Sequence, residues 1–334
     1  MKPFHHSQKS ITKLAILLVI TFTSTQVLAK HAPFERIVAF GDSISDTGNA
    51  FALLSKPENQ ACSGISQSVP PYAELDDFLI PGSPYAIGGH HFTNGATWLE
   101  GLAQAMALAG NVRPAFQNAG QKASNYAVGG ARARTINAPC RVDLETQKQV
   151  YLNDFPVTSE NTLVVIAMGG NDVRDAFAAA AIGEPGTAGL IIQTALQNIA
   201  GTFSDLYGRG ARHFLIMNAP DIGKTPALRL IPGAPAGAAY LTQVFNDNLV
   251  LLIQGAHAQG IDVRLLDVHA LVNAVVENPE PYGFNNATEA CVTPNQPPFK
   301  CKKPDTYVFW DGIHPTKSLH EIIAKEAIAV MSYN

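Results

Sequence analysis

Apolar residues in this chain form short continuous runs that alternate with longer stretches of helical periodicity. Four runs rich in β-branched residues predict buried strands: Glu35–Phe40, Thr162–Met168, His213–Met217 and Val263–Val268. A shorter fifth strand is expected to end near Val128. Apolar residues recur at helical spacing in four other stretches: Thr97–Leu108, Gly189–Tyr207, Ala239–Gln259 and Lys317–Met331. This alternation predicts an α/β fold with a mostly five-stranded parallel sheet, covered by helices on both faces.

Two stretches fit neither the strand pattern nor the helix pattern. Residues 52–93 and 219–238 are rich in proline and glycine, and the second contains the apolar residues Leu228, Leu230 and Ile231. Long irregular segments often form lids or pocket walls. The alternative is that both stretches are surface loops without a role in function.

The first 29 residues have the pattern of a cleavable signal peptide. Lys2, Lys9 and Lys13 precede a short apolar core, Leu14–Phe22, and small residues end at Ala29. This core is much shorter than the ~20 residues that span a bilayer, so export is favoured over a retained membrane anchor. We therefore expect a signal peptide over residues 1–29, one domain over residues 30–334, and a secreted or periplasmic protein.

Composition narrows the classes of partner and cofactor. The net charge of −4 and the lack of basic runs argue against a nucleic-acid partner. Four cysteines in an exported protein suggest two disulfides, and of the three possible pairings we favour Cys291–Cys301 with Cys62–Cys140. No CxxC pair or neighbouring histidine has the spacing of a zinc site, so we expect no metal and no cofactor.

Four short blocks carry the chemically informative residues. They are Gly41–Asn49 (GDSISDTGN), Asn125–Ala131 (NYAVGGA), Gly169–Asp172 (GGND) and Asp311–Thr316 (DGIHPT). The first and third blocks follow predicted strands directly. Because reactive groups gather beyond the carboxyl ends of parallel strands, we expect the blocks to meet at one edge of the sheet.

Together the blocks contain the groups that acyl transfer needs. A serine hydroxyl such as that of Ser43 is a weak nucleophile and needs a base to take its proton. His314 is the best candidate for this base, because histidine is the side chain whose unperturbed pKa lies near the working pH, and Asp311 three residues earlier can orient its ring. The backbone N–H groups of Ser43 and Gly130 and the amide of Asn171 are the candidate donors for an oxyanion hole.

Each assignment also has a structural alternative. Ser43 and Asn171 could each cap a following helix, a position that both residue types favour. Gly129 and Gly130 could form only a turn, and Gly129 rather than Gly130 could supply the backbone donor. His314, considered alone, could be a solvated residue at the start of a helix.

Other polar residues near the blocks are expected to be structural. Asp42 and Asp46 are expected to act as caps or loop anchors, because Asp readily bonds to neighbouring backbone groups. His90 and His91 are expected at the surface or at a pocket rim.

Through these four blocks, the chain resembles the GDSL family of the SGNH hydrolases, which are serine esterases and lipases. The resemblance extends over essentially all of residues 30–334. It implies a flavodoxin-like three-layer α/β/α fold, Ser43, Asp311 and His314 as the catalytic residues, and Ser43, Gly130 and Asn171 as the oxyanion hole. One departure is His91, because relatives usually carry an arginine before the Phe-Ser-Asn-Gly-like run.

The amino-acid sequences of the blocks are most similar to the corresponding motifs of bacterial secreted phospholipases, lysophospholipases and choline-ester hydrolases. The expected function is therefore hydrolysis of a lipid, lysophospholipid or choline-type ester through an acyl-enzyme on Ser43, with transient contact to a membrane surface. Three alternatives remain: a lipid acyltransferase with the same site, a carbohydrate acetyl-esterase, and a catalytically silent binding module.

Overall fold

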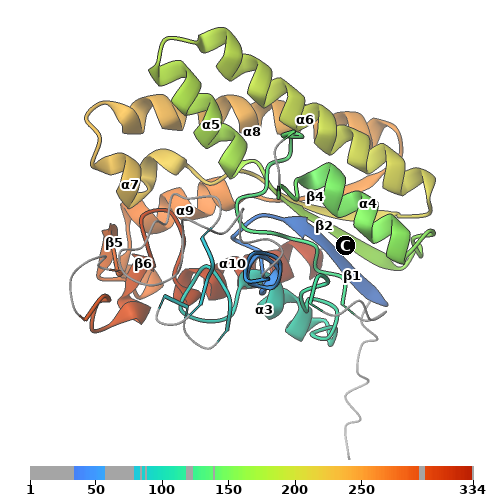
Figure 1. Cartoon of the computed structure of the whole chain (residues 1–334), viewed down its shortest axis with the longest axis horizontal. Helices are drawn as coiled ribbons and strands as arrows, with labels where there is room; N and C mark the ends of the chain where they lie inside the picture. Colours follow the sequence, from blue (N-terminus) through green and yellow to red (C-terminus); the bar gives the residue numbers. More distant parts are fainter. Residues whose placement is uncertain are drawn as a thin grey trace, which may run out of the picture. The chain divides into compact units, whose positions relative to one another are not determined.

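Four parallel strands form the central sheet of the structure, a computed structural model (Figure 1). They lie side by side in the order β1 (Arg36–Gly41), β2 (Thr162–Ala167), β3 (His213–Met217) and β4 (Asp262–Leu266). The structure describes residues 34–56, 79–82, 85–86, 89–117, 123–137, 140–292 and 298–332. The predicted signal peptide, most of the 52–93 stretch and Cys62 lie outside these residues. Within them, no helix is long and apolar enough to cross a membrane.

The expected fifth strand is a hydrogen-bonded segment at the outer edge of β1 rather than a regular strand. Asn125 forms one parallel bridge with Ala39. The N–H groups of Tyr126 and Val128 donate to the carbonyls of Ala39 (2.8 Å) and Gly41 (3.1 Å). With this segment counted second in chain order, the spatial order is 2-1-3-4-5, which is the flavodoxin-like order. The order reverses between β1 and β2.

Helices cover both faces of the sheet and complete the three predicted layers. On one face lie α4 (Leu144–Asp154), α5 (Gly170–Ala181), α6 (Pro185–Gly208) and α8 (Ala234–Ala258). On the other face lie α3 (Trp98–Ala105), α9 (Val268–Glu277) and α10 (Lys317–Ser332) (Figure 1). Side chains alternate between the two cores along each strand: Val38 and Phe40 pack with the first group, Ile37 and Ala39 with the second.

The pattern predicted the long elements well but misplaced several boundaries. The predicted strand Val263–Val268 ends at Leu266, and Val268 is the first residue of α9. The α8 helix begins five residues before the predicted start, with Pro235 in its first turn, where a missing N–H costs no helical hydrogen bond. The 219–238 stretch contains two short helical elements, η2 (Ile222–Lys224) and α7 (Pro226–Arg229).

A second, small sheet lies near the carboxyl-terminal end of the chain. It pairs β5 (Asn286–Ala290) with β6 (Tyr307–Phe309). The predicted disulfide Cys291–Cys301 is present and ties the end of β5 to the chain before β6. The predicted Cys62–Cys140 bond stays a prediction, since Cys62 lies outside the described residues. Among the described residues there are also three short helical segments: α1 (Asn49–Leu54), η3 (Glu280–Tyr282) and η4 (Pro304–Thr306).

Candidate active site

The four blocks meet beyond the carboxyl ends of β1 and β2, where the strand order reverses. Ser43 lies two residues after the end of β1, and Asn171 is the second residue of α5, which follows β2. The chain turns sharply after Gly41, where an added Cβ would lie 3.1 Å from both Ala127 and Ser45. Glycine at this position therefore lets the serine approach the rest of the site.

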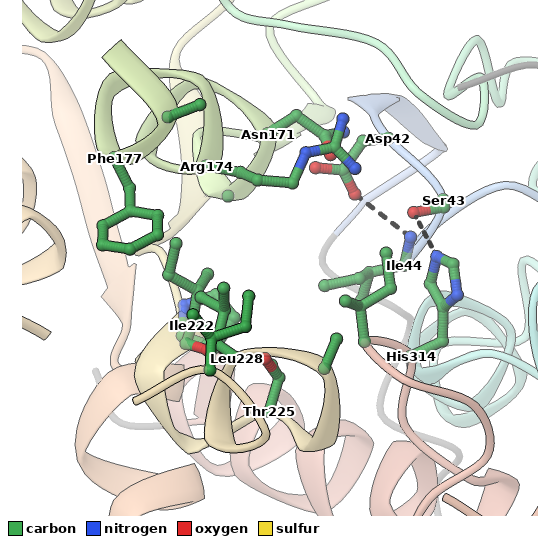
Figure 2. Close-up of a pocket in the computed structure, with 16 residues that line it drawn as sticks. Asp42, Ser43, Ile44, Asn171, Arg174, Phe177, Ile222, Thr225, Leu228 and His314 are labelled. Atoms are coloured by element: carbon green, nitrogen blue, oxygen red, sulfur yellow. Dashed lines mark hydrogen bonds between the residues drawn. The ribbon is translucent and has the colours of Figure 1, made fainter. Parts of the chain in front are cut away.

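Ser43, His314 and Asp311 form a continuous hydrogen-bonded chain. His314 Nε2 lies 2.8 Å from Ser43 Oγ, and His314 Nδ1 lies 2.7 Å from Asp311 Oδ2 (Figure 2 draws the contact with Ser43). Asp311 Oδ1 accepts the backbone N–H groups of Ile313 (2.8 Å) and His314 (2.6 Å). All three side chains of the chain are buried. The sequence-predicted nucleophile, base and acid are therefore brought together with hydrogen-bonding geometry.

Opposing effects act on the ionisation of Asp311. Burial alone would raise its pKa, but the charge of His314 and the hydrogen bonds from His314, Tyr85 and Ile313 hold the pKa below its usual value. Asp311 is thus a carboxylate throughout the neutral range. It can keep Nδ1 of His314 protonated and leave Nε2 free to accept the proton of Ser43.

The predicted oxyanion donors lie on three different segments. Asn171 donates one amide hydrogen to the carbonyl of Ala131 (2.9 Å), which leaves its second amide hydrogen for a ligand. Within the described part of the chain, the backbone N–H groups of Ser43 and Gly130 have no hydrogen-bond acceptor. Gly129 N–H, the alternative donor, is bonded to Asp46 Oδ2 (2.8 Å). The geometry therefore favours Gly130, whose φ of 77° lies in the left-handed region that suits glycine.

The structural alternatives for Ser43 and Asn171 do not fit the observed helix starts. The helix that follows Ser43 begins only at Asn49, and the hydroxyl of Ser43 bonds to His314 instead of capping a helix. Asn171 lies inside the first turn of α5, after the cap residue Gly169. Both polar side chains are thus directed to the site rather than to a helix end.

Asp46 is a loop anchor, as expected from its neighbours. Its carboxylate accepts the backbone N–H groups of Gly48, Asn49, Ala50 and Gly129 at 2.6–2.9 Å. These bonds connect the Ser43 loop to the glycine pair at 129–130. The loop of the candidate nucleophile Ser43 and the segment of the candidate oxyanion donor Gly130 are therefore fixed by the same carboxylate.

An ion-pair network that the sequence analysis missed ties the donor segments together. Arg132 donates to Asp175 through Nε and Nη2 (both 2.9 Å) and to the carbonyl of Gly130. Asp172 accepts the backbone N–H groups of Ala133 (2.8 Å) and Arg134 (3.3 Å), and burial raises its pKa to about 6 despite these bonds. The first turns of α5 are thereby fastened to residues 130–134. No local motif signals these pairs, because their partners are about 40 residues apart.

A pocket of about 270 Å³ opens beside Ser43 and His314. Ser43 and His314 lie at one end of it, and Phe177 of α5 lies on the opposite side (Figure 2). Most of its wall is apolar and comes from α5, the 219–238 stretch and the two site loops: Ile44, Phe177, Ala178, Pro220, Ile222, Ala227, Leu228, Ile231 and Ile313. Of the two explanations for the 219–238 stretch, a pocket wall is the one observed.

Two charged residues, Asp42 and Arg174, add to the polar side of the same pocket. Asp42 Oδ1 accepts the N–H of Ile44 (3.1 Å), and burial raises the pKa of Asp42 to about 6, although this bond and the nearby His314 act in the other direction. In Figure 2 the side chain of Arg174 extends toward Asp42. Ser43 therefore lies between a charged group of residues and a long apolar wall.

Of the two neighbouring histidines, only His91 lies differently from the prediction, because His90 is partly exposed. His91, expected at the surface or a pocket rim, is buried and pairs with Glu100 (3.3 Å) at the start of α3. The charge of Glu100 raises the pKa of His91, which opposes the effect of burial. His90 stacks on the ring of Phe51 with 3.5 Å between ring centroids. Neither histidine lines the pocket beside Ser43.

A serine bonded to a buried His–Asp pair, at the carboxyl edge of a parallel sheet, defines a site of the serine-hydrolase class. Residues 37–327 match the family model described as GDSL-like Lipase/Acylhydrolase, and the chain belongs to that family. The family consists of serine hydrolases that act on carboxylic esters. The protein is therefore an enzyme of the esterase/lipase type, as its sequence blocks predicted.

Relatives in plants and bacteria align over most of the chain. A GDSL esterase/lipase of Arabidopsis thaliana is 27% identical over 330 residues, which cover 87% of this chain and 84% of that protein. A thermolabile hemolysin of Vibrio parahaemolyticus is 26% identical over 327 residues, or 92% of this chain and 66% of the hemolysin.

Among solved structures, an acetylxylan esterase from Geobacillus stearothermophilus covers 90% of this chain and 94% of its own, at 14% identity and a TM-score of 0.43. A phospholipase from Streptomyces albidoflavus covers 90% of this chain and 100% of its own, at 14% identity and a TM-score of 0.40.

Proposed function

We propose that this enzyme hydrolyses carboxylic esters with apolar acyl groups through an acyl-enzyme on Ser43. The observation that carries the proposal is the unbroken hydrogen-bonded chain from Ser43 through His314 to Asp311, placed at the end of an apolar pocket. Each member is within hydrogen-bonding distance of the next, which is the geometry that general-base activation of a serine requires.

In the first half of the reaction, His314 Nε2 takes the proton of Ser43 as Oγ attacks the ester carbonyl. The negative charge that develops on the carbonyl oxygen is stabilised by Ser43 N–H, Gly130 N–H and the free amide hydrogen of Asn171. His314 then gives its proton to the departing alcohol. The acyl group is left as an ester on Ser43 Oγ.

In the second half, water takes the place of the alcohol. His314 accepts a proton from the water as its oxygen attacks the acyl carbon, and the same three donors hold the second oxyanion. Collapse of this intermediate breaks the bond to Ser43 Oγ, which recovers its proton from His314. Asp311 stabilises the imidazolium form of His314 in both halves.

The shape of the pocket supports a lipid-type ester as the substrate class. An acetyl group would leave most of the 270 Å³ empty, whereas a longer hydrocarbon chain would remove the lining of Leu228, Ile231 and Phe177 from water. A lipid, lysophospholipid or choline ester with such an acyl chain fits this site better than an acetylated carbohydrate.

The proposed place of action is outside the cytoplasm, in the periplasm or in secreted form. The Cys291–Cys301 disulfide supports an oxidising compartment, since such bonds are rare in reducing ones. The signal-peptide pattern of residues 1–29 supports the same conclusion from the sequence.

The test is hydrolysis of p-nitrophenyl acetate, butyrate, decanoate and palmitate by the purified protein, with Ser43→Ala beside it. We expect turnover to be highest on a chain longer than acetate and to disappear in Ser43→Ala. A preference for acetate would favour the carbohydrate esterase, and transfer of the acyl group to an added lipid alcohol would favour the acyltransferase. A folded protein that is inactive on every ester would support the silent binding module.

A further inference from the structure

Four residues from a segment far away in sequence hold the Asp311–Thr316 block from its outer side. Phe92 packs its ring on that of His314, with 5.2 Å between the centroids. Thr93 Oγ1 donates to the carbonyl of Pro315 (2.8 Å), and Asn94 Oδ1 accepts the N–H of Lys317 (2.8 Å). With Tyr85, these residues form what we call the clasp: Tyr85, Phe92, Thr93 and Asn94.

Tyr85 is the member of the clasp that contacts the buried carboxylate. Its hydroxyl donates to Asp311 Oδ2 at 2.6 Å and lies 3.5 Å from His314 Nδ1. The side chain is fully buried, and its ring meets the indole of Trp310 edge-on, with 6.2 Å between the centroids. Of these two groups, Asp311 is the acceptor of the phenol hydrogen, because His314 Nδ1 itself carries the hydrogen that it donates to Asp311.

We infer that Tyr85 is a positioning residue for the reaction. Its hydroxyl sets the orientation of the Asp311 carboxylate and the strength with which that carboxylate attracts the protonated ring of His314. This inference rests on the proposed roles of Asp311 and His314. Neither the sequence blocks nor the family match assigns any role to Tyr85.

The first argument is the number of hydrogen bonds that the two oxygens of the Asp311 carboxylate accept. Asp311 Oδ1 accepts two backbone N–H groups, from Ile313 and His314, and Oδ2 accepts the Tyr85 hydroxyl and the His314 ring. Four donors on one carboxylate leave it no alternative rotation. Without Tyr85, Oδ2 keeps only the histidine ring among the partners that the described residues supply, and the carboxylate can turn.

The second argument is electrostatic. A hydrogen bond from Tyr85 stabilises the negative charge on Oδ2, which reduces the attraction of that charge for the imidazolium of His314. Without the hydrogen bond from Tyr85, the carboxylate of Asp311 attracts the imidazolium of His314 more strongly, which favours the protonated form of His314. The base then becomes active only at a higher pH, so the acidic limb of the activity profile moves upward.

Other ionisable groups around His314 also act on its charge and must stay in place during the test. Asp42, on the nucleophile side, and His320, of α10, both interact electrostatically with His314. Burial lowers the pKa of His320 to about 3, so that side chain stays neutral across the working range. His91 interacts with His320 and pairs with Glu100. Replacing the hydroxyl of Tyr85 alone leaves these groups unchanged.

The experiment is the pH profile of kcat/KM for Tyr85→Phe, which keeps the ring and removes the hydroxyl. We expect kcat/KM to fall roughly 10-fold or more, as is typical for loss of a hydrogen bond to a charged group, and the acidic limb to move to higher pH. Tyr126→Phe is the matched control. Tyr126 is also buried and donates to a carboxylate, Asp154 Oδ2 at 2.7 Å, and neither of these two residues lines the pocket beside Ser43.

A double-mutant cycle separates this role from a merely structural one. If Tyr85 acts through Asp311, the effect of Tyr85→Phe shrinks strongly in an Asp311→Asn background. A wild-type profile in Tyr85→Phe, equal shifts in Tyr85→Phe and Tyr126→Phe, or fully additive effects with Asp311→Asn would overturn the inference.

Two further arms keep the test decisive. If Tyr85→Phe does not fold, 3-fluorotyrosine introduced at position 85 strengthens the donor, and the acidic limb should then move to lower pH; no movement contradicts the inference. If the wild type hydrolyses esters through Ser43 and the variants at position 85 have the wild-type pH profile, only the role of Tyr85 is refuted. A wild type without esterase activity refutes the proposed function and this inference with it.

Discussion

The two sides of the site are built in different ways. Ser43 and Asn171 follow directly from the ends of β1 and β2, in the middle of the main sheet. His314 and Asp311 follow β6, a three-residue strand of the small sheet, and are held by the disulfide-linked segment and by the clasp. The nucleophile side therefore takes its geometry from the core of the fold. The acid–base side depends on a few contacts between segments far apart in the sequence.

This difference teaches where function and stability are coupled. On the nucleophile side, Asp46 and the Arg132–Asp175 pair hold several backbone segments at once, so their loss would disturb the fold as well as the site. On the acid–base side, single contacts can be removed while the main sheet stays intact. With the covalent Cys291–Cys301 bond excepted, we expect substitutions there to change turnover and its pH dependence before they change the free energy of unfolding.

Removing the base should have the largest effect on turnover. His314→Ala leaves Ser43 without a proton acceptor, and we expect kcat to fall by about 10⁴-fold or more, as in other serine hydrolases. The melting temperature should change little, because the main sheet is not touched. Steady-state kinetics on p-nitrophenyl butyrate and a thermal melt measure both; an active His314→Ala variant would remove the base from the account.

A large but smaller effect is expected on the nucleophile side at Asn171. Asn171→Ala removes one oxyanion donor together with the bond to Ala131, and kcat should fall by about 10²–10³-fold with KM changed far less. Asn198→Ala is a control of the same chemistry, because the amide of Asn198 also donates to a backbone carbonyl, that of Ala133 (3.1 Å), but it does not line the pocket. Similar losses of kcat in the two variants would refute the oxyanion role.

Gly129, on the nucleophile side, lies against Phe92 of the clasp, on the acid–base side. A substitution at Gly129 should therefore affect both sides of the site. A Cβ at Gly129 would lie 2.2 Å from Cζ of Phe92, whose ring packs on His314. We expect Gly129→Ala to displace the ring, destabilise the protein by about 1–3 kcal/mol and lower kcat between about 10- and 100-fold. The double variant with Phe92→Leu should recover part of both losses. No recovery would mean that the strain is relieved elsewhere.

The smallest effect on turnover is expected from the disulfide. Replacing Cys291 and Cys301 together by serine should lower the free energy of unfolding by about 2–3 kcal/mol, while turnover at room temperature changes by less than about threefold. Chemical denaturation and ester hydrolysis on the same preparation test this. A large loss of turnover without a loss of stability would show that the disulfide positions His314 more directly than the comparison implies.

The sequence was sufficient for the parts of the molecule that are specified locally. The strands β1, β2 and β3 could be predicted within one residue because each is a short run of buried, mostly apolar residues with a clear end; only the first residues of β1 and β3 are partly exposed. The blocks around Ser43 and Asn171 follow such strands, so their meeting at one sheet edge could be foreseen. The position of His314 came only from its motif, since β6 is too short to show a pattern.

The remaining features depend on contacts that no local pattern records. Tyr85 lies in a stretch that looked like an irregular loop, and its contact with Asp311 joins residues more than two hundred positions apart. The α4 helix was missed because its apolar residues are few and its buried side chains include Gln147 and Lys148. The fifth sheet position lacks regular strand geometry, so its edge could be placed only approximately.

The most direct test of the account is to identify the residue that an ester-like phosphonate inhibitor modifies. Intact-mass and peptide mass spectrometry of the inhibited enzyme should show one adduct, on the peptide that contains Ser43, formed in step with the loss of esterase activity. Ser43→Ala should form none. An inhibited enzyme with its adduct on another residue, or with no covalent adduct, would contradict the proposal that Ser43 is the nucleophile.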